Sequence, residues 1–171
     1  MDLSTILPAL IENLQNIIPA RIIKNYQRGL LYIFGWRWTD IPPGWPVVWI
    51  PLLMSCHIEN CASQPFETPL QTIETKDGYT VNITVAITYN IWSLYNWVSI
   101  LNGDNSIENA VQGAVTEACR NLTWKEIHEG GNILDIILQS LNEKVEAWGV
   151  EIENLELINC ARTKAYRLII N

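Results

Sequence analysis

The most regular pattern in the sequence is an alternation of apolar and polar residues between Thr80 and Ile91. Every second residue from Val81 onward is apolar, and the residues between are polar or small. This period of two predicts a half-buried antiparallel strand. The Lys76-Asp77-Gly78 segment before it favours a turn, because an Asp-Gly pair readily adopts positive φ. We therefore predict a hairpin between Phe66 and Ile91, with Asp77 and Gly78 as its structural turn.

A second pattern, with helical spacing, occupies the N-terminal segment. Its apolar positions are Leu3, Ile6, Leu7, Leu10, Ile11, Leu14, Ile17 and Ile18. A stripe of this period predicts an amphipathic helix over 3–18, whose regular part begins at Pro8. Residues 26–34 then favour a strand, and residues 36–58 predict short strands joined by a Trp- and Pro-rich loop with a Pro43-Gly44 turn.

Helical patterns dominate the stretch after Ile91. Ser93 can cap a short helix that ends near Leu101, and Thr123 with Glu126 forms a capping box for another short helix. A capping box of Asn105 and Glu108 predicts a longer helix that ends near Leu122. The last helix is expected over 132–148, with a glycine just beyond its end.

One strand returns after the helices. Val150 and Ile152 alternate with glutamates, and the apolar phase then changes, which predicts a bulge near Asn154. Strands, then helices, then a returning strand indicate an α+β class with helices packed against an antiparallel sheet. We expect an amphipathic helix within 1–24, one sheet domain over 25–160, and a short tail over 161–171 that begins a helix.

Length and composition limit the possible classes of protein. A chain of 171 residues with 49% hydrophobic and 17% charged residues is typical of one globular domain. The net charge of −7 argues against a sequence-independent nucleic-acid binder, which needs a basic surface. Two long uncharged stretches are poor membrane spans, because prolines interrupt 41–58 and Thr and Asn recur through 79–103.

The sequence contains no recognisable catalytic constellation. His57 and His128 have no nucleophile in a known motif beside them, and no phosphate-binding glycine motif occurs. The four cysteines lack the paired spacing of a zinc site, which favours buried or unreactive thiols. Glu151, Glu153 and Glu156 lie on the polar side of the returning strand and favour a solvated face. We therefore expect no enzyme activity, cofactor, metal or small-molecule substrate.

Five short motifs resemble, in order, those of the SPFH or band 7 family, which includes stomatins, prohibitins and flotillins. They are Gln27-Arg28-Gly29 with Phe34-Gly35, Pro43-Gly44 with Ile50-Pro51-Leu52-Leu53, Thr75-Lys76-Asp77-Gly78-Tyr79-Thr80-Val81, Glu117-Ala118-Cys119-Arg120 with Leu122, and Trp148-Gly149-Val150 with Ile152. The third is the most specific, and together they cover about residues 26–165.

The resemblance implies a non-enzymatic scaffold that lies against a membrane face and assembles side by side with further copies of itself. It also implies an SPFH-type sheet domain over 25–160. Relatives carry an N-terminal apolar anchor and continue into a long coiled coil. This sequence has the amphipathic 3–18 segment in place of the anchor and reaches Asn171 without a coiled coil.

The distribution of charge and tryptophan indicates a docking face. Four basic and no acidic residues occur between Asn13 and Thr39, and four of the eight tryptophans lie in the same N-terminal region, between Trp36 and Trp49. Trp and Arg favour the lipid headgroup zone, and they are also frequent anchors of protein interfaces. We expect docking through Leu3, Ile6, Leu7, Leu10, Ile11, Leu14, Trp45, Trp49, Leu52 and Leu53, with Arg21, Lys24 and Arg37 at the rim.

Three interpretations of this face stay open. The leading one is a homo-oligomeric scaffold at the cytoplasmic face of a membrane. The second is a soluble structural subunit of a larger assembly, such as a viral particle, which docks on protein through the same face. It is favoured by the polar side of the 3–18 helix, which carries Glu12 and no basic residue, unlike most membrane-surface helices. The third is a small regulator that docks on a membrane protease.

Overall fold

The computed structural model describes residues 20–129 and 132–163. The helix expected over 3–18 and most of the C-terminal tail lie outside these residues. The chain divides into two compact units, Met1–Ala62 (unit 1) and Ser63–Asn171 (unit 2). Within the described ranges, unit 1 consists of strands and unit 2 of strands and helices.

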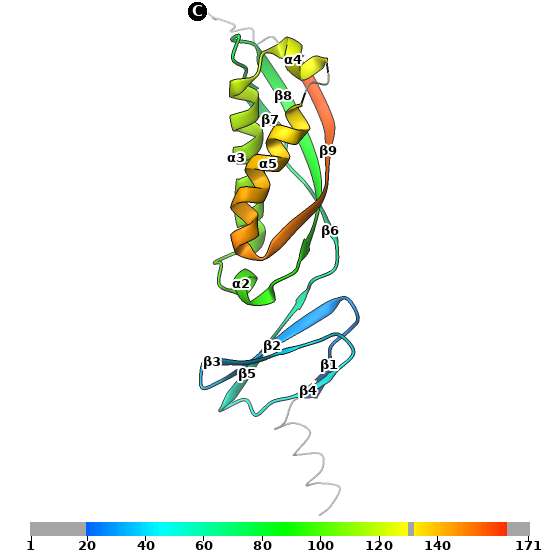
Figure 1. Cartoon of the computed structure of the whole chain (residues 1–171), viewed down its shortest axis with the longest axis vertical. Helices are drawn as coiled ribbons and strands as arrows, with labels where there is room; N and C mark the ends of the chain where they lie inside the picture. The colour runs from blue at the N-terminus through cyan, green and yellow to red at the C-terminus, as the bar shows by residue number, and fades with distance from the viewer. Residues whose placement is uncertain (1–19, 130–131, 164–171) are drawn as a thin grey trace, which may run out of the picture. The chain divides into compact units, whose positions relative to one another are not determined.

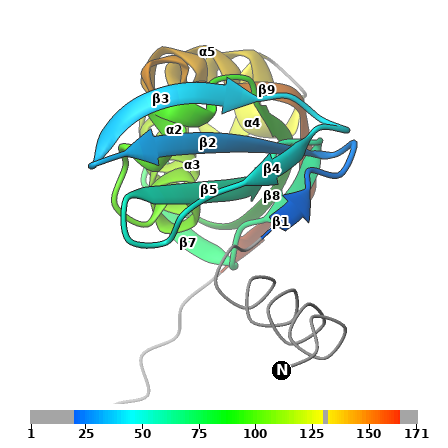
Figure 2. The same cartoon turned by 90° about the horizontal axis from the view of Figure 1, so that it is seen from below.

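Unit 1 contains two small antiparallel sheets. The larger has the order β3-β2-β5, formed by Trp36–Ile41, Gln27–Ile33 and Met54–Asn60 (Figure 2). The smaller pairs β1 (Ala20–Ile22) with β4 (Pro46–Val48). Strand β1 thus begins inside the 1–24 segment, directly after the residues expected to be helical. The short strands predicted over 36–58 are confirmed as β3, β4 and β5.

The core of unit 1 lies between these sheets. Four side chains form it at 8% exposure or less: Ile23, Leu31, Ile41 and Val47. Trp49, Met54, Cys56 and Ile58 pack against them and are partly buried. This core is small, so little of the apolar content of unit 1 can be hidden in it.

Unit 2 is a four-stranded antiparallel sheet with helices on one face. The central strand is β8 (Thr80–Ile91), which pairs on one side with β6 (Gln64–Glu67) and β7 (Gln71–Glu74), and on the other with β9 (Val150–Thr163). Figure 1 shows α3 (Gly103–Asn121) and α5 (Ile133–Val145) side by side over this sheet. The short helices are α2 (Leu94–Val98), α4 (Trp124–His128) and the 3-10 turn η1 (Glu146–Trp148).

The predicted alternation of β8 is confirmed. Val81, Ile83, Val85, Ile87, Tyr89 and Ile91 are all buried. They form a core with the inward side chains of the helices, among them Ile107, Val111, Val115, Ile137 and Leu141. Together with the antiparallel pairing, this confirms the α+β class.

Helix and strand ends show where the pattern was misleading. The capping box predicted at Asn105 is wrong, because α3 already begins at Gly103 after Asn102, which has left-handed backbone geometry. A Cβ at Gly103 would lie 2.5 Å from the Trp97 ring, so the packing of this indole fixes the start of the helix. The box of Thr123 and Glu126 is confirmed.

The returning strand is longer and more irregular than expected. β9 continues to Thr163, although its last three residues were predicted to begin a helix. The guanidinium of Arg162 lies over the Tyr79 ring at 3.6 Å from its centroid. Strand β9 remains paired with β8 up to Thr163, beside this contact. The register shifts at Glu153, one residue from the predicted bulge, and a second time at Ile158.

Candidate docking surface

Unit 1 exposes large apolar side chains that its small core does not use. They are Ile22, Phe34, Trp36, Trp38, Trp45, Val48, Ile50, Leu52 and Leu53. Most of these side chains lie in turns or on the outer face of a strand. The strand register places most of them in two groups.

The first group, the tip cluster, consists of Phe34, Trp36, Leu52 and Leu53. The turn between β2 and β3 and the loop before β5 meet at one end of the sheet, because Ile33 pairs with both Trp36 and Met54. The Phe34 N–H donates to the Leu53 carbonyl oxygen at 2.9 Å and joins turn to loop. Leu52 is 91% exposed, Trp36 80% and Phe34 72%, so the tip presents its apolar side chains almost fully to solvent.

The second group, the ribbon cluster, consists of Ala20, Ile22, Trp45, Pro46 and Val48. Val47 of β4 is buried, and its neighbours Pro46 and Val48 therefore point away from the core, as do their partners Ile22 and Ala20. Trp45, 63% exposed, adjoins a hollow of about 420 Å³ that Ile41 and Pro42 also line. The outer side of the β1–β4 ribbon is thus continuously apolar.

The structure divides the residues expected to dock. Trp45, Leu52 and Leu53 belong to the two exposed clusters, whereas Trp49 packs against the core of unit 1. The expected docking residues between Leu3 and Leu14 lie outside the described ranges. The sequence did not indicate Ile22, Phe34 and Trp36 as exposed. The apolar Phe34-Gly35 turn is a signal for Phe34 and Trp36, since the tip of a hairpin is exposed.

The expected basic rim occupies three different environments. Arg21 stands opposite the buried Val47 on the ribbon and is exposed. Lys24 extends over the Tyr26 ring at 5.5 Å. Arg37 forms a two-point ion pair with Asp40, at 2.6 Å from Nη2 and 3.2 Å from Nε, so much of its charge is balanced within unit 1.

The predicted turn has a second structural role. Gly78 has φ +78°, and Thr75 and Tyr79 close the turn through their backbones. The Asp77 carboxylate accepts hydrogen bonds from the Thr75 hydroxyl at 2.6 Å and from the backbone N–H of Trp124, the first residue of α4. The Thr75 hydroxyl and this N–H lower the pKa of Asp77. The turn therefore anchors a helix 47 residues away.

Several titratable groups of the described residues have surroundings that indicate a structural role. Burial raises the pKa of Cys119 to about 11 and that of Cys56, Cys61 and Cys160 above the ordinary value, so these thiols stay protonated near neutral pH. His128 stacks on Trp124 at 5.4 Å between ring centroids. Glu153 accepts a hydrogen bond from Asn90 at 2.8 Å.

The described ranges contain neither a cluster suited to a metal ion nor a helix suited to span a membrane. No group of three or more His, Cys, Asp or Glu side chains within them could hold a metal ion. None of the helices in residues 20–129 and 132–163 combines the length and apolar character needed to cross a bilayer.

The five motifs and the antiparallel sheet with its helices agree with the family to which the chain is similar. Residues 21–168 match the SPFH domain / Band 7 family, and the chain belongs to that family. The resemblance derived from the five motifs is thereby confirmed.

Individual relatives are distant and longer. The chain is 24% identical to human Stomatin-like protein 1 over 139 residues, which are 80% of this chain and 35% of that protein. It is 22% identical to Stomatin-1 of Caenorhabditis elegans over 139 residues, 80% of this chain and 42% of the relative. Against Band 7 protein CG42540 of Drosophila melanogaster the identity is 22% over 142 residues, and the coverage is 80% and 28%. The chain thus spans roughly a third of the length of these relatives.

Proposed function

We propose that this protein is a non-enzymatic scaffold that lies against the cytoplasmic face of a membrane and assembles with further copies of itself. Membrane-associated scaffolds are common in the SPFH family. The observation that carries the proposal is the exposed apolar surface of unit 1, formed by the tip and ribbon clusters with Arg21 and Lys24 beside them. Lipid is the partner through this surface.

The size of the exposed surface supports a partner of some kind. Full burial of one large apolar side chain contributes about 1.5–3 kcal/mol. The fold leaves the side chains of Leu52, Trp36 and Phe34 largely in water. Most of this free energy of burial is therefore still available from contact with a partner. Indole rings and basic side chains together match the headgroup zone of a bilayer, where a basic residue near anionic lipid contributes about 1 kcal/mol.

Assembly is the second part of the proposal. Unit 1 exposes two apolar clusters, and large exposed apolar patches are uncommon on soluble monomers. A ring requires head-to-tail contacts, so we expect a heterologous interface between copies. Sedimentation in the absence of detergent tests this point, and a stable 19.5 kDa species at micromolar concentration contradicts it.

A soluble subunit of a larger protein assembly is the alternative function. It is favoured by the ion pair between Arg37 and Asp40, which balances one of the charges expected to face anionic lipid. In this alternative the tip and ribbon clusters contact a partner subunit, and Trp and Arg again supply the anchors.

Vesicle flotation separates the two functions. The tip variant Leu52→Ser removes one of the most exposed apolar side chains of unit 1, and Leu101→Ser is its matched control in unit 2, where Leu101 is 88% exposed. We expect the intact protein and Leu101→Ser to float with anionic vesicles, and Leu52→Ser combined with Trp36→Ser to sink.

The controls make the result specific. Trp49 is unsuited to this test because its substitution would disturb the core it packs against. Circular dichroism confirms that each variant is folded. If the intact protein never floats, and the tip variants abolish assembly, then the membrane proposal is wrong and the protein-assembly alternative holds.

A further inference from the structure

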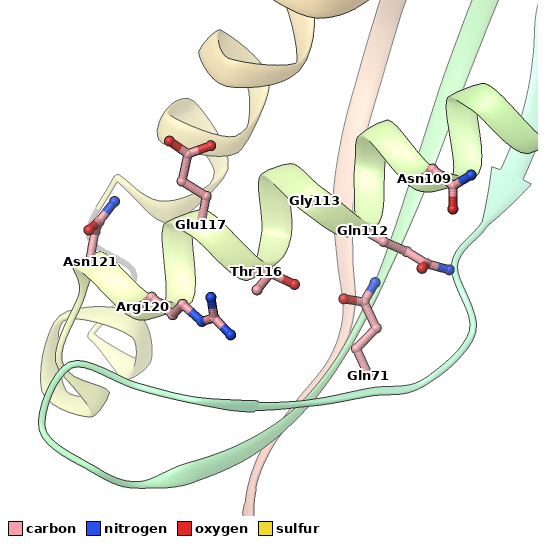
Figure 3. Close-up of a pocket in the computed structure, with 8 residues that line it drawn as sticks. All are labelled: Gln71, Asn109, Gln112, Gly113, Thr116, Glu117, Arg120 and Asn121. Atoms are coloured by element: carbon pink, nitrogen blue, oxygen red, sulfur yellow. The ribbon is translucent and has the colours of Figure 1, made fainter.

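Unit 2 contains an open groove between strand β7 and helix α3. It measures about 620 Å³ and is lined by Gln71 of β7 and by a polar stripe of α3. Figure 3 shows Gln71 extending from the strand toward the helix, and Gln112, Thr116 and Arg120 on the facing side of α3. Its volume lies in the range of ligand-binding sites.

The strand beside this groove is an edge strand. In the described residues β7 pairs only with β8, so its other side has no strand partner. Thr68 extends the same edge toward β6: its N–H donates to the Val85 carbonyl oxygen at 2.9 Å, and its hydroxyl accepts from the Val85 N–H at 3.0 Å. Backbone groups on such an edge can pair with an added strand.

A groove between an edge strand and a helix matches one particular mode of recognition. Extended peptides dock in this arrangement by strand addition, with main-chain hydrogen bonds to the edge and side chains in contact with the helix. The stripe from Asn109 to Arg120 extends roughly 16 Å along the helix, which corresponds to about five residues of extended chain. The length of the groove therefore suits a short peptide segment.

The side-chain amide of Gln71 indicates one group that this peptide must offer. The Nε2 atom of Gln71 is buried and has no hydrogen-bond partner among the residues that the structure describes. A buried donor of this kind is costly unless an acceptor reaches it, and a peptide carbonyl can do so. Gln71 thus supplies an observation independent of the shape of the groove.

Charge at the end of the groove adds a second requirement. Glu117 lies 3.5 Å from the Lys144 ammonium and accepts from the Ser140 hydroxyl, so a cation already faces this carboxylate. Arg120 is exposed and forms no ion pair within the described ranges. Its guanidinium can bind a carboxylate through two parallel hydrogen bonds.

We propose that the groove between β7 and α3 binds an extended acidic peptide of a partner protein by strand addition. Gln71 donates to a peptide carbonyl, and Arg120 binds a carboxylate of the peptide. On this basis unit 2 carries a binding site for a partner protein, and this site is different from the surface of unit 1 that is proposed to contact the membrane.

Gly113 provides a precise way to block the groove. A Cβ at this helical position would have no neighbouring heavy atom within 4 Å, so a larger side chain can occupy the groove without disturbing the fold. Gly113→Tyr is the blocking variant, and Gly113→Ala is its matched control. Arg120→Glu removes the proposed carboxylate contact, and Lys125→Glu is a control of equal charge change on the exposed surface of α4.

The experiment uses a displayed library of random twelve-residue peptides, selected against the folded protein and then measured as synthetic peptides by fluorescence anisotropy. We expect the selected peptides to be acidic. Gly113→Tyr and Arg120→Glu should each weaken binding at least about tenfold, whereas the two controls should bind as the intact protein does. Hydrogen exchange of the β7 amides should slow when the peptide binds.

Each remaining outcome overturns the proposal. It is wrong if no peptide is enriched, or if the enriched peptides bind the blocked variant equally well. If Gly113→Tyr leaves peptide binding unchanged but abolishes self-association, the groove is a contact between copies. Vesicle flotation of the groove variants should equal that of the intact protein, so failure here is distinguishable from failure of the membrane proposal.

Discussion

Replacement of Gly149 by alanine should destabilise unit 2 more than any other small change at a glycine of the sheet domain. Gly149 has φ +73°, and its carbonyl oxygen accepts from the N–H groups of Trp92 and Ser93 at 2.9 and 3.1 Å. A Cβ at this position would lie 2.5 Å from the Ser93 carbonyl oxygen and 2.5 Å from its Cβ. The backbone at Ser93 cannot withdraw without stretching the contact that joins the end of β8 to the start of β9.

The expected cost follows from these contacts. Left-handed geometry costs an alanine about 1–2 kcal/mol, and weakening of the two hydrogen bonds adds about 0.5–1.5 kcal/mol each. We therefore expect Gly149→Ala to lower the free energy of unfolding by about 2–5 kcal/mol. Gly113→Ala, in open space on α3, should instead raise it by about 1 kcal/mol, because alanine favours a helix interior.

Urea unfolding followed by circular dichroism at the helical band measures both variants, since the helices of the described residues belong to unit 2. A loss below about 2 kcal/mol in Gly149→Ala would refute the close approach of Gly149 to Ser93, because left-handed strain alone accounts for that much.

Two further predictions concern the turn and its helix. Gly78→Val should cost about 1–3 kcal/mol, because a β-branched residue tolerates positive φ poorly, and an unchanged melting temperature contradicts the turn. The backbone N–H and hydroxyl of Thr123 lower the pKa of Glu126, so this carboxylate stabilises the fold above its unfolded pKa and the contribution disappears as pH falls through the folded value. Urea midpoints measured from about pH 6 to about pH 3 should therefore decline less steeply in Glu126→Gln than in the intact protein.

The sequence predicted β8, the α4 capping box and the glycine after the last helix because each depends on local periodicity or local hydrogen bonds. Thr123 and Glu126 satisfy each other within one turn, so no distant contact is needed to predict them. The start of α3 depends instead on the Trp97 ring over Gly103, and the last residues of β9 depend on pairing with β8. Such tertiary contacts override local propensity and leave no periodic pattern.

The candidate docking surface was predictable only in part for a related reason. Composition indicated that the Trp-rich region holds more apolar side chains than a small core requires, but it did not show which of them are buried. Trp45 and Trp49 are four residues apart in the same segment, yet the first is exposed and the second packs on the core. Strand register and the position of a turn decide this outcome. The groove at Gln71 left no motif, because an edge strand and a distant helix form it together.

The charges of the chain predict that binding to vesicles depends on anionic lipid and on salt. Residues 1–62 contain four basic and four acidic residues, and two of the acidic ones precede residue 20; residues 63–171 contain seven basic and fourteen acidic residues. An anionic surface therefore attracts the described part of unit 1, residues 20–62, where four basic residues face two acidic ones, and repels unit 2. Basic residues contribute about 1 kcal/mol each near such a surface, and salt screens this attraction over a Debye length of about 8 Å at physiological ionic strength.

Flotation should accordingly weaken as salt rises or anionic lipid is withdrawn, while the apolar contribution of the tip cluster persists. Arg21→Glu should reproduce the effect of high salt, because it reverses one of the four positive charges of unit 1, and Lys125→Glu on unit 2 should not. If Arg21→Glu floats as well as the intact protein, with salt dependence unchanged, then Arg21 does not lie near the headgroups. Lipid would in that case meet unit 1 through the tip cluster, and the basic residues would serve the fold or another partner.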